Sequence, residues 1–142
     1  ILDVGCGKGF LLHDLLEAIP GVQVSGIDVS EYAIENSMED VKRFLKVADA
    51  KALPFPDKSF DLVFSINTIH NLPLEDLKTS LREIERVGRK HKYVVIDAYR
   101  TEEEKTRLLK WNLTAQTHMY CDEWIELFDS VGYTGDYFWF IP

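Results

Sequence analysis

The chain is poor in the residues that build crosslinked, membrane-spanning or polyanion-binding proteins. It has two cysteines, Cys6 and Cys121, too few for a disulfide scaffold or a zinc cage. No apolar run approaches the roughly 20 residues that cross a bilayer, and we find no signal-peptide pattern. Lysine and arginine number 16 against 24 aspartates and glutamates, so long nucleic acid and anionic membranes are poor partners. We expect a reducing, cytoplasmic setting.

What the chain does contain is typical of one globular domain. Its 142 residues are 46% apolar and 28% charged, a balance that excludes disordered and fibrous proteins. The chain opens without Met, directly in a strand-like run, and ends as abruptly. We therefore expect a single core domain over residues 1–142, truncated at both ends.

Strand-like runs alternate with helical patterns along the whole chain. This alternation is typical of α/β proteins, and we predict a doubly wound, mainly parallel sheet. The predicted strands are residues 1–4, 22–27, 44–47, 60–66, 92–98 and 133–141. Ser30 is the predicted N-cap of a helix carrying apolar residues at positions 34, 38 and 41, Thr101 and Glu104 have capping-box spacing, and Asp122 is the predicted N-cap of the last helix.

A glycine-rich turn, Gly5-Cys6-Gly7-Lys8-Gly9, joins the first strand to the first helix. Glycine lacks Cβ, so the backbone can turn sharply there and approach a ligand closely. Asp28, at the end of the second strand, can accept both hydroxyls of a ribose. Strand, turn, helix and carboxylate in this order predict a site for a nucleotide-like ligand.

Two residues distinguish between possible nucleotide ligands. A dinucleotide site needs a third glycine where this chain has Phe10. Asp3, just before the turn, would repel a pyrophosphate and attract a cation such as an ammonium group. The ligand is therefore expected to be a nucleoside with positive charge and no pyrophosphate, and S-adenosylmethionine fits that description.

Three motifs in the first 100 residues resemble those of class I S-adenosylmethionine-dependent methyltransferases, in the small-molecule branch often called type 11. They are the segments ILDVGCGKG at residues 1–9, GIDVS at 26–30, and ADA at 48–50 with the following LPF and FDLV. The resemblance implies a Rossmann-like sheet of order 3-2-1-4-5, with an added strand at the far edge. Beyond residue 100 only the architecture matches.

The resemblance also implies contacts to the methionine portion of the cofactor. Gly5 and Gly7 would pass beneath it, with Gly9 completing the turn, and Asp3 would help to hold its ammonium group. A backbone carbonyl near Ser65 to Asn67, at the end of the fourth strand, would accept a hydrogen bond from the same ammonium.

The adenosine portion has its own implied contacts. Asp28 would take the ribose hydroxyls, and Val29 would pack on the adenine ring. Asp49 would accept from the adenine amino group, and the N–H of Ala50 would meet a ring nitrogen. Asp28 and Asp49 could also be helix caps or turn residues, as aspartate often is.

The candidate catalytic residue is His70, which follows the fourth strand. It is either a general base or substrate contact, or a histidine that caps the following helix or hydrogen-bonds locally. His118, Tyr99, Arg100 and the aromatic and amide residues at 111–120 are further candidates for the acceptor pocket. We predict no metal site.

The leading hypothesis is a methyltransferase that moves a methyl group from S-adenosylmethionine to a small organic acceptor by in-line displacement, leaving S-adenosylhomocysteine. An NAD-dependent oxidoreductase is less well supported, because the glycine spacing and Asp3 disfavour it. A cofactor-binding relic that serves as an interaction module stays open, because binding residues are more evident than a catalytic base.

Overall fold

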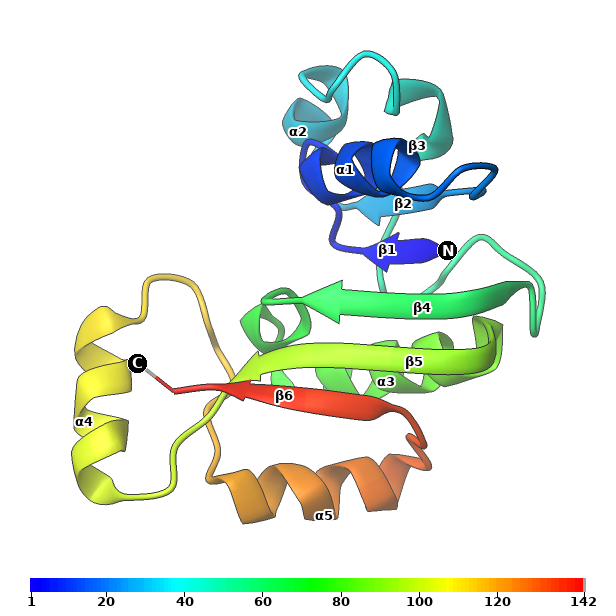
Figure 1. Ribbon diagram of the computed structural model, residues 1–142. Coiled ribbons are helices and arrows are strands. Elements are labelled where there is room, and N and C mark those ends of the chain that lie inside the picture. The colour runs from blue at the N-terminus through cyan, green and yellow to red at the C-terminus, as the bar shows by residue number, and fades with distance from the viewer. Residues whose placement is uncertain (142) are drawn as a thin grey trace.

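The computed structural model describes residues 1–141, which form a six-stranded sheet of order β3-β2-β1-β4-β5-β6 (Figure 1). The strands are β1 (Leu2–Val4), β2 (Ser25–Asp28), β3 (Leu45–Val47), β4 (Phe60–Ile66), β5 (Gly88–Asp97) and β6 (Asp136–Phe140). Every neighbouring pair is parallel. The predicted doubly wound parallel sheet, its order and the added edge strand are confirmed.

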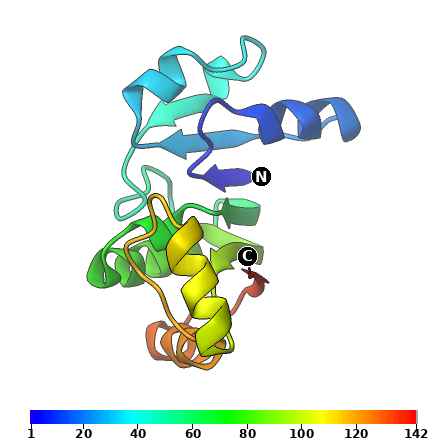
Figure 2. The same cartoon turned by 90° about the vertical axis from the view of Figure 1, so that its left-hand side faces the viewer.

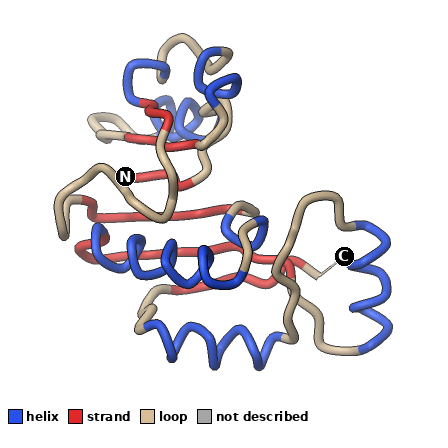
Figure 3. Tube along the Cα trace, turned by 180° about the vertical axis from the view of Figure 1, so that it is seen from behind, coloured by secondary structure: helices blue, strands red, loops and turns tan. Residues whose placement is uncertain are grey.

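Helices cover both faces of this sheet. They are α1 (Phe10–Ala18), α2 (Glu31–Glu35), α3 (Leu74–Val87), α4 (Glu102–Trp111) and α5 (Cys121–Val131), with the 3-10 helices η1 (Lys42–Phe44) and η2 (Ile69–Asn71). Figure 3, which views the molecule from behind, shows α3 and α5 side by side on the near face of the sheet, whereas α1 lies on the opposite face, which faces the viewer in Figure 1. Alternation along β4 matches these layers, because Val63 packs in the cluster with α3 and α5 and Phe64 in the cluster with α1.

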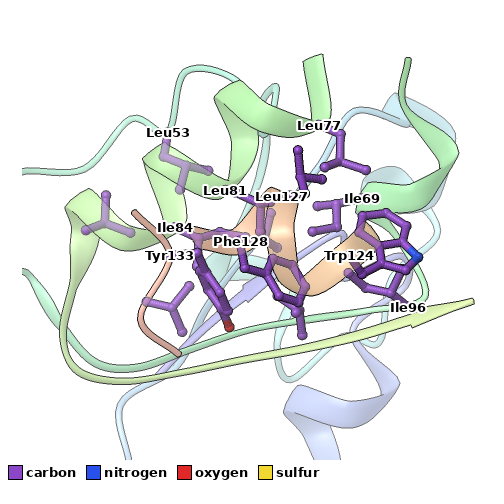
Figure 4. Close-up of a cluster of buried hydrophobic side chains, with 14 of the residues drawn as sticks. Leu53, Ile69, Leu77, Leu81, Ile84, Ile96, Trp124, Leu127, Phe128 and Tyr133 are labelled. Atoms are coloured by element: carbon purple, nitrogen blue, oxygen red, sulfur yellow. The ribbon is translucent and has the colours of Figure 1, made fainter. Parts of the chain in front are cut away.

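The larger core lies between the sheet and the pair α3 and α5 (Figure 4). Leu77, Leu81 and Ile84 repeat at helical spacing along α3 and are fully buried. Trp124 of α5 is also fully buried in this cluster. Burying each such side chain contributes about 1.5–3 kcal/mol, so β4 and β5 rest on a rigid layer. That layer fixes the positions of the residues that follow these two strands.

Because all six strands are parallel, their carboxyl ends lie at one edge of the sheet. Strand order reverses between β1 and β4, and in open α/β sheets a ligand crevice forms at such a switch point. Helix α4 lies beyond the carboxyl ends of the strands, off the end of the sheet (Figures 1 and 2). The loops that leave β1, β2, β4 and β5 therefore face one another at this edge.

Several predicted element boundaries are wrong. The second strand begins at Ser25, because its partner β1 starts with the pair Leu2↔Ser25 and residues 22–24 have no strand to pair with. The fifth strand begins at Gly88, four residues before the prediction, because β4 pairs with it from Phe60 onward. The final strand is limited to β6, where each residue has a partner on β5. Pairing partners, which lie far away in sequence, decide these limits.

The helix that follows Ser30 is shorter than its apolar spacing predicts. The Ser30 hydroxyl caps it as expected and accepts from the N–H of Ala33 at 3.1 Å. Helix α2 nevertheless ends at Glu35, and the N–H of Met38 donates to the carbonyl of Lys8 in the glycine turn at 2.9 Å. The segment after α2 is thereby tied to the glycine turn rather than to its own helix.

The two later caps differ in detail from the prediction. Thr101 Oγ1 accepts from the N–H of Glu104 at 3.2 Å, but the Glu104 carboxylate accepts from the N–H of Arg100 at 2.7 Å, so the reciprocal bond is shifted by one residue. The N-cap of α5 is Tyr120, which places Asp122 inside the first turn. The predicted Asp122 cap is therefore wrong, although an acidic residue there still favours the helix dipole.

Candidate functional site

A cavity of about 120 Å³ opens at the carboxyl edge beside the switch point between β1 and β4. Its lining residues are Gly5, Ile27, Asp28, Val29, Ala48, Asp49, Ala50, Lys51, Thr68 and Leu72. Five of these are residues that the sequence predicts as cofactor contacts, namely Gly5, Asp28, Val29, Asp49 and Ala50. Loops from β1, β2, β3 and β4 thus converge on one hollow, which we call the nucleoside cavity.

Gly5 lines the nucleoside cavity at a position where a side chain would be strained. Its φ of 91° lies in the left-handed region, which side chains other than glycine rarely adopt. A Cβ at this position would lie 2.2 Å from both Cγ2 and Oγ1 of Thr68. Thr68, which follows β4, is a site residue that the sequence does not predict, and only the packing of β4 against β1 reveals its role.

Asp28 organises the two loops that flank the cavity. Its Oδ2 accepts from the N–H of Gly7 at 2.8 Å, and its Oδ1 accepts from the N–H of Ser30 at 2.8 Å. Each carboxylate oxygen can accept more than one hydrogen bond, so both retain capacity for a ligand. The carboxylate is therefore held rigidly by the backbone at the end of β2.

Asp3 lies in the middle of the sheet, paired with Gly26 on one side and Phe64 on the other. It is 5% exposed, and it supports the wall of the nucleoside cavity without lining it. Burial first, and the charge of Asp28 second, raise the pKa of Asp3 to about 7. A buried carboxylate with this pKa gains energy from a nearby cation, which would favour its charged form.

The remaining turn residues, Cys6, Gly7 and Gly9, are not in the lining of the cavity. Gly7 donates its N–H to Asp28, and Gly9 packs so closely that a Cβ there would lie 2.7 Å from Val41 Cγ2. Burial raises the pKa of the Cys6 thiol, and the charges of Asp3 and Asp28 raise it further. Cys6 therefore packs as a small neutral side chain in the second core cluster.

The adenosine side of the cavity is partly prearranged. Asp49 Oδ1 accepts from the N–H of Lys51 at 2.9 Å, which is a turn contact, and Lys51 Nζ lies 3.6 Å from its Oδ2. Lys51 Nζ also donates to Asp76 at 2.8 Å. Val29 is 75% exposed, an unusual position for a valine and one that offers an apolar surface to a planar ring.

A second cavity, of about 250 Å³, lies beyond the ends of β4 and β5, and we call it the β4–β5 cavity. It is lined by Asn67, His70, Asp97, Trp111, Asn112, Leu113 and Thr114. Asn67 has a φ of 51° and donates its N–H to the carbonyl of Val95 at 3.0 Å. Asn67, which the sequence predicts as a cofactor contact, lines this cavity and is not in the lining of the nucleoside cavity, whereas the next residue, Thr68, lines the nucleoside cavity.

His70 is 3% exposed in η2, and its ring contacts the end of β5. The backbone N–H of Asp97 donates to Nδ1 of His70 at 3.1 Å, and His70 Nε2 lies 3.8 Å from Asp97 Oδ2. Burial, and to a lesser degree His118, lower the pKa of His70 to about 4. His70 is therefore neutral at pH 7, and its Nδ1 is committed to the backbone of β5, while the residue also lines the β4–β5 cavity.

Asp97 is a candidate site residue that sequence reasoning missed. It is 2% exposed at the end of β5, and its Oδ1 is buried without a hydrogen-bond partner among residues 1–141. A buried acceptor without a hydrogen bond reduces the stability of the folded protein, and a ligand that donates to it would remove this cost. A polar residue ending a strand at the carboxyl edge is the signal that could have found it, but Asp97 lies inside the predicted strand 92–98.

The 111–120 segment is only partly placed at the β4–β5 cavity. Its N-terminal part lines the cavity, and the N–H groups of Gln116 and Thr117 donate to the carbonyl of His70. His118 lies at a separate hollow, and Tyr99 packs edge-on against Tyr120 at a centroid distance of 4.5 Å. Arg100 Nε donates to Glu104. Neither Tyr99 nor Arg100 lines the β4–β5 cavity, so the prediction that they face the acceptor pocket is wrong for this cavity.

Neither a metal centre nor a membrane span is found in the part of the chain that the structure describes. No group of three or more His, Cys, Asp or Glu side chains there could hold a metal ion. No helix within residues 1–141 has the length and apolar character needed to cross a bilayer.

Comparison with known proteins identifies the family to which this chain is similar. Residues 2–96 match the family described as "Methyltransferase domain". The rat protein named "Arginine-hydroxylase NDUFAF5, mitochondrial" is 37% identical over 87 residues, which are 61% of this chain and 24% of that protein. A tRNA (carboxymethyluridine(34)-5-O)-methyltransferase of Arabidopsis thaliana is 34% identical over 127 residues, 88% of this chain and 30% of that protein.

Solved structures share the fold. A chain in the complex between the Haloferax volcanii Trm112 methyltransferase activator and a methyltransferase superposes with a TM-score of 0.75 at 24% identity, covering 92% of this chain and 59% of that one. The chain spans less than a third of the two curated relatives named above. The family match over two-thirds of the chain, together with the sheet order, shows that this chain belongs to the class I S-adenosylmethionine-dependent methyltransferases.

Proposed function

We propose that this chain binds S-adenosylmethionine in the nucleoside cavity and transfers its methyl group to a small organic acceptor in the β4–β5 cavity. The observation that carries the proposal is the convergence of two carboxylate-bearing loops on Gly5, where a Cβ would collide with Thr68. A cavity lined by a glycine turn and a backbone-held Asp28 is suited to a nucleoside.

The residues around the nucleoside cavity fit this cofactor in their chemistry. Asp28 would accept from the ribose hydroxyls, and Asp49 from the adenine amino group, with Val29 against the ring. The buried carboxylate of Asp3 would offset the positive charge of the methionine portion. The carbonyl of Asn67 accepts from Nδ2 of Asn71 at 3.3 Å, and its second lone pair would accept from the ammonium. No basic residue other than Lys51 lines the cavity within the described chain, and Lys51 is paired with Asp76, so a pyrophosphate would have little to bind.

When bound, the cofactor supplies a methyl group already activated on a sulfonium. The chain then has to bring the acceptor atom into line with that methyl and keep water away from it. Consecutive residues, Asn67 and Thr68, line the two cavities, so an acceptor in one would lie near a cofactor in the other. His70 is proposed as a contact to the acceptor, because its ring lines the β4–β5 cavity.

The size and charge of the chain favour a small acceptor. A cavity of about 250 Å³ suits a molecule of one or two rings, and the net charge of -8 disfavours a polyanion. The names of the relatives point to tRNA in one case and to arginine in another, so an acceptor group carried on RNA is the second candidate. Both cysteines are free, and we propose a cytoplasmic setting on that basis.

The experiment is a transfer assay with methyl-labelled S-adenosylmethionine and three acceptor classes: a panel of small hydroxyl and amine compounds, bulk tRNA, and a denatured protein mixture. Label in the small-molecule fraction, with stoichiometric release of S-adenosylhomocysteine, is the expected result. Label confined to the tRNA fraction would favour the second candidate. Cofactor binding without transfer to any class would favour a non-catalytic binding module.

A further inference from the structure

Two of the polar residues that line the β4–β5 cavity, His70 and Asp97, have a fixed hydrogen-bonding polarity. A backbone N–H can only donate, so Nδ1 of His70 is an acceptor for Asp97, and the ring proton of neutral His70 is on Nε2. The Nε2–H group has no hydrogen-bond partner among residues 1–141, since Asp97 Oδ2 lies 3.8 Å away. This pair therefore presents one unused donor, Nε2–H, beside one carboxylate that can only accept when ionised.

A single ligand atom can satisfy both groups. Two polar atoms 3.8 Å apart can each lie about 2.8 Å from one bridging oxygen. That oxygen must accept from His70 and, through its own hydrogen, donate to Asp97. A hydroxyl group does both, whereas an ether oxygen cannot donate and a carboxylate would be repelled by Asp97.

Lone-pair counting separates a hydroxyl from an amine. A hydroxyl oxygen has two lone pairs, so one can accept from Nε2–H of His70 while the other attacks a methyl group. A neutral amine has one lone pair, and a hydrogen bond from His70 would occupy the pair needed for attack. The site therefore favours an oxygen nucleophile.

We propose that the β4–β5 cavity holds the hydroxyl group of a small organic acceptor between Nε2–H of His70 and the carboxylate of Asp97, so that this chain methylates oxygen with Asp97 as the proton acceptor. This inference rests on the proposed function, because it assumes a sulfonium methyl donor in the neighbouring cavity. Trp111 and Leu113, which also line the cavity, supply an apolar surface for the body of the acceptor.

The step balances with the groups named. The hydroxyl oxygen forms a bond to the methyl carbon as the carbon–sulfur bond breaks, and that electron pair stays on sulfur as a neutral thioether. The hydroxyl proton passes to Asp97, and His70 keeps its own proton throughout. Burial raises the pKa of Asp97, which strengthens it as a base, while His118 has the opposite and smaller effect. His70 faces the same carboxylate and is neutral, and His118 is the other titratable group close to the pair.

The test uses 4-nitrophenol, an aryl hydroxyl whose ionisation is followed by its absorbance. We expect saturable binding in which the bound hydroxyl stays protonated at a pH where the free compound is partly ionised. Asp97→Leu should weaken binding about tenfold or more, because a hydrogen bond to a charged group is lost. Asp97→Asn keeps an acceptor and the shape, so it should retain binding but let the bound phenol ionise at lower pH.

The matched ligands are 4-nitroanisole, which lacks the hydroxyl proton, and 4-nitrobenzoate, which carries a negative charge. Both should bind at least about tenfold more weakly than 4-nitrophenol. Equal binding of 4-nitrophenol and 4-nitroanisole, no saturable binding of 4-nitrophenol, or an unchanged ionisation in Asp97→Asn would overturn the inference. Titration of the same variants with S-adenosylhomocysteine separates the two proposals, because Asp97 variants should keep that binding, and its absence in the wild type would count against the proposed function instead.

Discussion

The backbone N–H of Asp97 donates to Nδ1 of His70 at 3.1 Å and so joins the end of β5 to the 3-10 helix that follows β4. One ring nitrogen is thereby committed to holding the backbone, and the other faces the β4–β5 cavity. A histidine in this arrangement has both a structural and a ligand-facing role, and substitutions can separate them.

His70→Asn is the variant that separates the two roles. The asparagine Oδ1 can replace Nδ1 as the acceptor for Asp97, but it supplies no group in the place of Nε2–H. We expect near-normal stability and cofactor affinity, with turnover of a hydroxyl acceptor reduced at least about tenfold. His70→Phe should lose stability as well, because the buried N–H of Asp97 would have no partner. Thermal unfolding and turnover measured on both variants check this prediction. Full turnover in His70→Asn would show that His70 has only a structural role.

Acid pH should destabilise the fold through His70. Its pKa is lowered from 6.5 to about 4, so folding favours the neutral ring, and the stability it contributes is present above pH 6.5 and is lost as pH falls toward 4. At pH 5 this loss amounts to about 2 kcal/mol. Urea unfolding at pH 7 and pH 5 should show a larger decrease for the wild type than for His70→Asn. Equal decreases would mean that other groups cause the acid sensitivity.

Ionisation of Asp3 should lower the stability of the fold and raise its affinity for the cofactor. Its pKa is raised from 3.8 to about 7, so its contribution to stability is lost as pH rises through this window. Asp3→Asn is therefore expected to be more stable than the wild type at pH 8. Cofactor affinity in the wild type should rise about tenfold from pH 6 to pH 8, as Asp3 ionises, and should stay flat in Asp3→Asn. Calorimetric titration with S-adenosylhomocysteine at both pH values checks this, and parallel profiles would remove Asp3 from the site.

Asp28→Ala should weaken binding of S-adenosylhomocysteine by about 2–3 kcal/mol, tens of-fold to about a hundredfold. The carboxylate that would take the ribose hydroxyls is lost, and the N–H groups of Gly7 and Ser30 lose their acceptor. Asp14→Ala, at an exposed position on α1, is the matched control and should bind normally. If Asp28→Ala is folded and binds like that control, the ribose assignment is wrong.

Gly5→Ala tests how closely the backbone must approach Thr68. Gly21 offers the control, because it also has a positive φ, 80°, but a Cβ placed there would have no neighbouring atom within 4 Å. Gly21→Ala should lose about 1–2 kcal/mol from backbone strain alone. Gly5→Ala should lose at least about 1 kcal/mol more, because its Cβ would lie 2.2 Å from Thr68. Equal free energies of unfolding for the two variants would show that Thr68 moves away freely.

Much of the fold and of the nucleoside cavity could be predicted, because the signals are local. Glycine spacing, strand-ending aspartates and alternating strands and helices are read within short segments, and the structure brings Gly5, Asp28 and Asp49 to one cavity. The β4–β5 cavity could not be predicted in this way, because its residues are brought together by the register in which β4 pairs with β5. His70 meets Asp97 because β4 pairs with β5 and η2 folds back over the strand end, a contact across 27 residues that no local pattern contains.

The central claim is that the nucleoside cavity holds S-adenosylmethionine rather than a dinucleotide, and one calorimetric comparison tests it most directly. The wild-type chain is titrated at pH 8 with S-adenosylhomocysteine and, separately, with NAD. We predict saturable binding of one S-adenosylhomocysteine per chain and no measurable heat from NAD, because Asp3 disfavours phosphate and Lys51 is paired with Asp76. Saturable binding of NAD with none of S-adenosylhomocysteine would contradict the account.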